Sequence, residues 1–131
     1  MIPKFRAWEE SAEEDLQMWS WKEMCEIGLG QLFNNPKYEL MQNTGLKDTN
    51  GVEIYEGDIV RYTWDLPNDV NATEKGKKNR VSKVFWSDWR ASFAVGKKSA
   101  NSDLFRYVRN GNTVEIIGNI YENPELLEVA E

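Results

Sequence analysis

Two sharp turns, a few residues apart, constrain the fold of this chain more than any other feature. Asn50-Gly51 is a strong turn dipeptide because both residues tolerate positive φ, and we expect Gly51 to adopt it. Gly57-Asp58 marks a second bend, from which the alternation of apolar and polar residues predicts a strand over Asp58–Trp64. Closely spaced turns leave room only for short strands, which favours a mainly β fold.

Short segments with the alternation or the β-branched composition of strands recur along the rest of the chain. The predicted strands are residues 4–8, 16–21, 38–42, 58–64, 80–86, 91–95 and 114–121. Asn123-Pro124 is expected to start a short C-terminal helical turn, because proline is favoured at the first helical position.

Several short strands in a chain of this length favour one compact barrel. A Gly-Asp pair followed by apolar residues is, by analogy, common at the entry to SH3-like barrels. We therefore expect residues 1–131 to form a single domain: an N-terminal β appendage at 1–44 and a small SH3-like barrel at 45–131.

The chain has no histidine and a single cysteine, Cys25, and both facts narrow its chemistry. Without imidazole, Ser-His-Asp and Cys-His mechanisms are excluded, and one cysteine cannot complete a four-ligand zinc site. Cys25 is expected to be a half-buried apolar residue. Carboxylate-bound magnesium is the one catalytic route left, and the 22 acidic residues form no recognisable metal motif. We expect no enzymatic activity, no cofactor, and no catalytic or metal-binding residues.

The same counts predict where the protein acts. A lone cysteine cannot form an internal disulfide, which indicates a reducing compartment. No apolar run is long enough to span a membrane, and residues 1–6 lack the apolar stretch of a signal peptide. The predicted location is the cytoplasm, with no membrane partner.

Four segments in a fixed order resemble one protein family, the YopX family of phage and prophage proteins. They are Lys4–Trp8, Met41–Asp48, Glu53–Val60 and Glu115–Leu127. The resemblance implies a β-rich fold with an SH3-like barrel and an origin in a phage or an integrated phage element. It implies no activity and no catalytic residues, because the biochemical role of the family is unknown.

Charge is unevenly distributed. Residues 75–109 contain ten basic and two acidic residues, whereas the whole chain has a net charge of −6. Aromatic residues interleave with these cations, and cations with aromatics can bind phosphates and bases. The candidate binding face consists of Lys75, Lys77, Lys78, Arg80, Lys83, Trp86, Trp89, Arg90, Lys97, Lys98, Arg106 and Arg109. The alternative is a solvated surface, with at least half of the interleaved aromatics in the core.

Tryptophan and methionine are concentrated in the first 24 residues, outside the predicted barrel. Both residue types are enriched in interface cores, so this segment packs either on its own barrel or on another subunit. We interpret the chain as a non-enzymatic interaction module that binds a protein partner or itself. The alternative function is a small nucleic-acid-binding module that uses residues 75–109.

Overall fold

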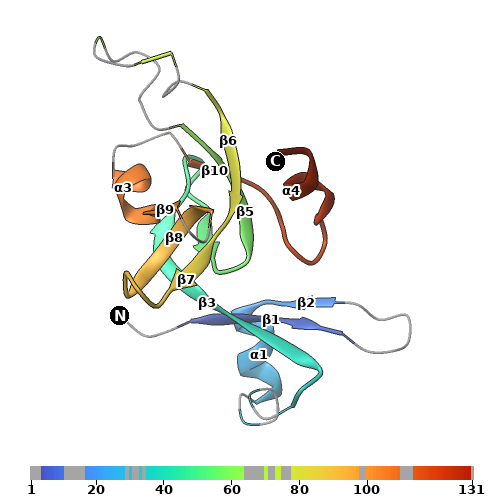
Figure 1. The fold of residues 1–131 in the computed structure, drawn as a ribbon. Coiled ribbons are helices and arrows are strands. Elements are labelled where there is room, and N and C mark those ends of the chain that lie inside the picture. Colours follow the sequence, from blue (N-terminus) through green and yellow to red (C-terminus); the bar gives the residue numbers. More distant parts are fainter. Residues whose placement is uncertain are drawn as a thin grey trace. The chain divides into compact units, whose positions relative to one another are not determined.

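The computed structural model describes residues 4–10, 17–28, 30, 33, 35–63, 70, 73–74, 78–97, 100–109 and 114–130. The chain divides into two compact units, Met1–Asn43 and Thr44–Glu131 (Figure 1). Each unit is described separately below.

The first unit contains an antiparallel sheet in which β1 (Phe5–Glu9) lies between β2 (Gln17–Trp19) and β3 (Tyr38–Lys47). Ala7 of β1 is paired with Trp19 on one side and with Leu40 on the other. A strand returning along residues 16–21 is therefore present, but it ends at Trp19.

The helix α1 (Trp21–Ile27) follows β2 directly, where the sequence analysis predicts a strand as far as Trp21. Ser20 caps this helix: its Oγ accepts from the Glu23 N–H at 3.2 Å, and the Glu23 carboxylate accepts from the Ser20 N–H at 3.1 Å. This reciprocal capping box satisfies two amide groups that a helix otherwise leaves without partners. The appendage is therefore a sheet with a helix rather than β structure alone.

A small apolar cluster holds α1 against the sheet of the first unit. Ala7 and Met24 are fully buried, and the partly buried side chains of Phe5, Trp19, Tyr38 and Leu40 pack around them. Phe5 also contacts Trp21, with ring centroids 6.3 Å apart. The N-terminal tryptophan and methionine residues thus contribute to the core of their own unit.

The second unit begins in β3 and turns sharply at Gly51, whose φ of 80° confirms the predicted left-handed turn. β4 (Glu53–Tyr55) returns from this turn beside β3 and was not predicted as a strand. β5 (Asp58–Tyr62) leaves the bend at Gly57, as expected. Along β5, Val60 and Tyr62 are buried and Arg61 is exposed, as predicted, but Ile59 and Thr63 are buried as well, so the alternation is only partial. Trp64, where the predicted strand ends, lies outside the described residues.

The sequence analysis predicts one strand over residues 80–86, but the structure separates β6 (Arg80–Lys83) from β7 (Phe85–Ser87) at Val84. The Val84 N–H donates to the Asp58 carbonyl, and the Val84 carbonyl accepts from the Gly57 N–H, both at 2.8 Å. β6 therefore pairs with β5, whereas β7 pairs with the next strand, β8. One run of chain thus contributes to two sheets.

The rest of the second unit completes these two sheets, in the strand orders β10-β5-β6 and β7-β8-β9 (Figure 1). The remaining elements are β8 (Ser92–Lys97), β9 (Ala100–Asp103), α3 (Leu104–Arg109), β10 (Val114–Asn119) and α4 (Glu125–Ala130). α3 packs against β8, and α4 packs against β6. β9 and α3 were not predicted.

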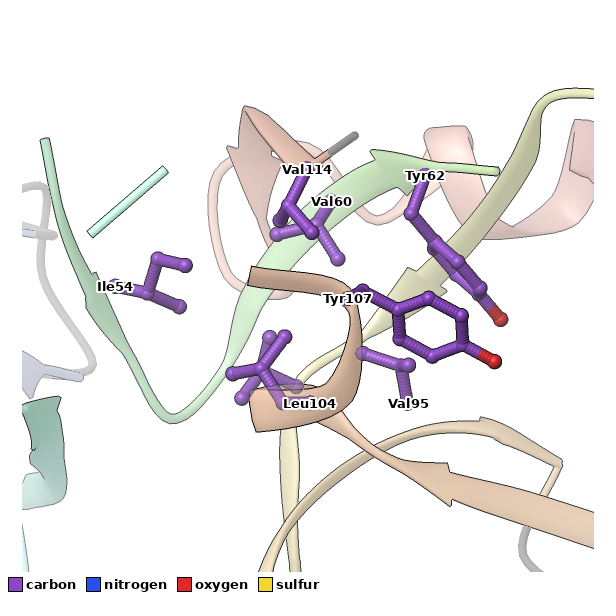
Figure 2. Close-up of a cluster of buried hydrophobic side chains, with 8 residues drawn as sticks. Ile54, Val60, Tyr62, Val95, Leu104, Tyr107 and Val114 are labelled. Carbon is purple, nitrogen blue, oxygen red and sulfur yellow. The ribbon is translucent and has the colours of Figure 1, made fainter. Parts of the chain in front are cut away.

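A buried cluster drawn from β4, from both of these sheets and from α3 forms the core of the second unit (Figure 2). Its members are Ile54, Val60, Tyr62, Val84, Val95, Leu104, Tyr107 and Val114. The rings of Tyr62 and Tyr107 lie 4.8 Å apart between centroids. Burial, with the nearby Tyr107 phenol, raises the pKa of Tyr62 above its ordinary value of 10.0, although Arg80 opposes this.

The prediction of a mainly β fold is confirmed: most of the described elements are strands, and the helices are short. The SH3-like barrel and the two-part division of the domain stay predictions.

Candidate binding surface

The residues predicted as a binding face are spread over several elements of the second unit. Lys78 is exposed before β6, Arg80 and Lys83 lie on β6, Trp86 on β7, Lys97 on β8, and Arg106 and Arg109 on α3. Trp89 and Arg90 lie in the turn between β7 and β8. Lys75, Lys77 and Lys98 lie outside the described residues. Contacts in the structure tie together a smaller set, centred on the β7–β8 hairpin.

Trp89 is the most exposed tryptophan among the described residues, with 87% of its surface accessible. The Cζ atom of Arg90 lies over its ring, 5.4 Å from the centroid. This cation–π contact favours one orientation of the indole without burying it. The turn therefore presents a flat aromatic ring beside a positive charge.

Trp86 stands on β7, close to the same turn, and is held more firmly. Its Nε1–H donates to Asp88 Oδ1 at 3.0 Å. Its ring meets Phe93 edge-on, with centroids 5.2 Å apart, and Phe93 in turn packs against the core cluster. Trp86 still exposes 45% of its surface, so one part of the ring is anchored and another is open to a ligand.

Two hydrogen bonds to Asn101 on β9 fix the side chain of Arg90. Its Nε donates to Asn101 Oδ1, and one terminal nitrogen donates to the Asn101 carbonyl at 2.7 Å. Asn101 is paired with Gly96 of β8, a partnership that only the strand register creates. The sequence analysis did not single out Asn101. We refer to Trp86, Trp89, Arg90 and Asn101 as the hairpin surface.

The segment that contains Trp86, Trp89 and Arg90 is basic. Residues 78–97 contain five basic residues and one acidic residue, Asp88. Ser82 Oγ accepts from the Gly96 N–H at 2.8 Å, which brings β6 next to β8. The exposed Lys83 and Lys97 follow these two residues directly in the chain. The hairpin surface therefore lies in a locally positive part of an acidic protein.

Two other aromatic residues of residues 75–109 belong to the core rather than to the hairpin surface. Tyr107 is 3% exposed, and Phe93 is packed against the core. Phe105 on α3 exposes 49% of its surface, and no contact given by the structure joins it to the hairpin surface.

A second set of polar residues lies in segments that carry the family resemblance, and these residues bind the backbone. Asp48 Oδ1 accepts from the N–H groups of Asn50 and Val52, each at 2.9 Å. Its other oxygen accepts from the Ile116 N–H at 3.0 Å. Asp58 accepts from the Tyr55 N–H at 2.8 Å. Both carboxylates are buried and serve as turn acceptors.

The turn after β10 is built in the same way. Asn119 Oδ1 accepts from the N–H groups of Tyr121 and Glu122, at 3.0 and 2.9 Å. Asn123 Oδ1 accepts from the Asn119 N–H at 3.2 Å. A Cβ atom at Gly118 would lie 2.6 Å from Asn123 Oδ1, so only glycine fits this packing. We refer to Asp48, Asp58, Gly118, Asn119 and Asn123 as the turn junction.

Three further observations complete the chemical picture. Within the described residues, no three acidic, cysteine or histidine side chains gather closely enough to hold a metal ion. None of the helices in the described part of the chain combines the length and the apolar character needed to cross a membrane. Cys25 is exposed rather than half-buried, because the neighbouring Met24 occupies the buried position of α1.

The chain is similar to known proteins in both sequence and fold. Residues 4–128 match the model of the family described as YopX protein. The fold is similar to the crystal structure of protein EF1440 from Enterococcus faecalis, with a TM-score of 0.54 and 26% sequence identity. That alignment covers 97% of this chain and 99% of the other. No curated protein sequence matches the chain. The family match spans nearly the whole chain, so the chain belongs to the YopX family.

Proposed function

We propose that this protein is a non-enzymatic interaction module of a phage or prophage, acting in the cytoplasm of a bacterial host cell. It binds a protein partner or a second copy of itself. Membership of the YopX family supports the phage or prophage origin in this proposal. The structural support comes from two observations. Buried polar side chains bind the backbone, and several apolar side chains of the first unit remain partly exposed.

The turn junction supports a structural role for the residues that resemble the family. Asp48 and Asp58 are the buried carboxylates of the described residues, and both accept hydrogen bonds from backbone amides. A buried carboxylate that is saturated by amide donors has little capacity left for a substrate or a metal. A role in folding therefore explains why these residues occur in the segments that resemble the family.

An aromatic contact group in the first unit is the observation that carries the proposal. Phe5 contacts Phe33 edge-on, with centroids 5.6 Å apart, and also contacts Trp21. Phe33 exposes 43% of its surface, and Ile27 at the end of α1 exposes 40%. Aromatic residues are enriched at the cores of protein interfaces, and the exposed part of Phe33 supports such a contact.

The second unit supports the proposal through its architecture. β6 and β7 are one run of chain that joins two three-stranded sheets at Val84. A bent strand shared by two small sheets is what we expect of an SH3-like barrel. Such a barrel is a compact scaffold for a binding surface, although fold alone does not determine a partner.

A substitution at the aromatic contact group tests the proposal. We expect Phe33→Ser to abolish self-association in sedimentation equilibrium, or to remove specific proteins retained from infected host cells. Val52→Ser is the matched control, because Val52 is exposed by 53% in a turn of the second unit. Equal behaviour of the two variants and the unmodified protein in both measurements would contradict a binding role for the first unit.

A further inference from the structure

We propose that the hairpin surface binds single-stranded nucleic acid, with a base stacked on the open side of Trp89 and the phosphate backbone beside Arg90. This inference goes beyond the proposed protein-binding role and uses a different unit of the chain. It rests on the exposure of the Trp89 ring, the fixed position of the Arg90 guanidinium and the positive charge of residues 78–97.

The exposure of Trp89 suits stacking. With 87% of its surface accessible, the ring can offer a face to a ligand. The Arg90 guanidinium lies over the ring at 5.4 Å and so favours a defined position for it. A base on the other face would complete a layer of cation, indole and base. Stacking of this kind tolerates any base, because every base has a π face.

The position of Arg90 suits phosphate binding. Asn101 receives hydrogen bonds from Nε and from one terminal nitrogen, which orients the guanidinium plane. The guanidinium has more N–H donors than these two contacts use, so donors remain for a phosphate oxygen. Because the side chain is already ordered, binding a phosphate costs little additional conformational entropy.

The local charge suits a polyanion. Five of the residues in 78–97 are basic, and the one acidic residue, Asp88, accepts a hydrogen bond from Trp86 Nε1. The exposed Lys83 and Lys97 lie on strands that Ser82 and Gly96 join. They supply further positive charge for a backbone that extends away from Trp89.

Two other polyanions fit less well. A duplex keeps its bases stacked on one another, so it could use the cations but not the face of Trp89. An acidic protein segment would also satisfy the cations, but its carboxylates are repelled by the electron-rich face of an exposed indole. The combination of a free ring and a fixed guanidinium therefore favours a single strand.

Binding is measured by fluorescence anisotropy of labelled oligo-dT and oligo-U of about 15 nucleotides, a length that one small domain can cover. The full chain is used at about 50 mM and about 200 mM salt, because phosphate contacts weaken as salt rises. We expect the single strands to bind at least about fivefold more tightly than a duplex of equal length, since only they expose a base for stacking.

Substitutions at exposed residues, in two pairs of a test variant and a control, locate the site. Trp89→Ala should weaken binding at least about fivefold, as expected for the loss of one stacked base, while Phe105→Ala should leave it within about twofold. Arg90→Gln should weaken binding and make the salt dependence shallower. Arg61→Gln removes an exposed charge on β5. It should change the affinity and the salt dependence less than Arg90→Gln does.

Three outcomes would overturn the proposal. One is no detectable binding of either single strand at the lower salt concentration. Another is equal binding by Trp89→Ala and the unmodified protein, because the ring would then have no role. The third is displacement of the oligonucleotide by polyglutamate as effectively as by unlabelled single strand, which would assign the surface to an acidic protein partner. The Phe33→Ser experiment is unaffected by any of these outcomes.

Discussion

The turn junction and the hairpin surface belong to the same unit but use their side chains in opposite ways. In the turn junction, Asp48 accepts three backbone hydrogen bonds and is 8% exposed. In the hairpin surface, Trp89 is 87% exposed and touches Arg90. The motifs recognised in the sequence therefore hold the fold together, and a segment between those motifs offers side chains to the solvent.

This difference teaches that a recognisable sequence pattern need not mark a functional site. Gly57 accepts from the Ile120 N–H at 2.9 Å and donates to Val84, so one corner ties β10 to the run shared by the two sheets. Gly57 also has a φ of 89°, a backbone conformation that few residues other than glycine adopt. The exposed ring of Trp89 has no such requirement, so this position can serve binding.

The largest expected effect concerns Asp48. Asp48→Ala should lower the free energy of unfolding by about 3 kcal/mol, because three backbone amide N–H groups lose an acceptor that is itself buried. Urea denaturation measures this change. Asp48→Asn is the control: it keeps one carbonyl oxygen for Asn50 and Val52 and should cost only about 1 kcal/mol. Equal losses for both variants would show that the carboxylate charge, rather than acceptor geometry, stabilises the turn.

The second effect concerns the packing of Gly118 on Asn123. Gly118→Ala should cost about 2 kcal/mol, because the added Cβ would lie 2.6 Å from Asn123 Oδ1 and 2.9 Å from Asn123 Cβ. In an Asn123→Gly background the same substitution should cost clearly less. A double-mutant cycle based on denaturation midpoints measures the coupling. A coupling free energy of zero would mean that Gly118 is required for another reason.

The two regions also differ in how well their structures could be predicted. Turns at Gly51 and Gly57 were predictable because the preference for positive φ is local to the dipeptide. The interruption at Val84 was not, because it depends on hydrogen bonds to Gly57 and Asp58, far away in sequence. The helix α1 is signalled in the sequence by the capping box of Ser20 and Glu23, whereas the alternation of residues 16–21 favours a strand.

The candidate site shows the same limit. The sequence showed the positive charge and the aromatic residues of 75–109, and it could not tell which of them are exposed. Trp89 and Tyr107 are both aromatic residues of this segment, yet one is exposed and the other is 3% exposed. Asn101 acquires its contact with Arg90 only through the pairing of β8 with β9. Burial and register are properties of the tertiary fold.

A third, smaller effect concerns the core that joins the two regions, where Tyr62 of β5 meets Tyr107 of α3. Burial raises the pKa of Tyr62, so the folded state favours the neutral phenol. This contribution is fully present below the ordinary tyrosine pKa of 10.0 and is lost as the pH rises through the raised pKa. The unfolding free energy should therefore decrease above pH 10.0, and less so in Tyr62→Phe. Identical alkaline profiles would contradict this assignment.

The smallest expected effect is at Trp89. Trp89→Ala should change the free energy of unfolding by no more than about 0.5 kcal/mol, because little of the ring is buried. Trp86→Ala, which removes the contact with Phe93 and the hydrogen bond to Asp88, should cost more in the same denaturation experiment. The two variants thus separate a ring that is anchored from one that is only presented. If Trp89→Ala cost as much as Trp86→Ala, Trp89 would stabilise the hairpin, and the contrast between the hairpin surface and the turn junction would no longer hold.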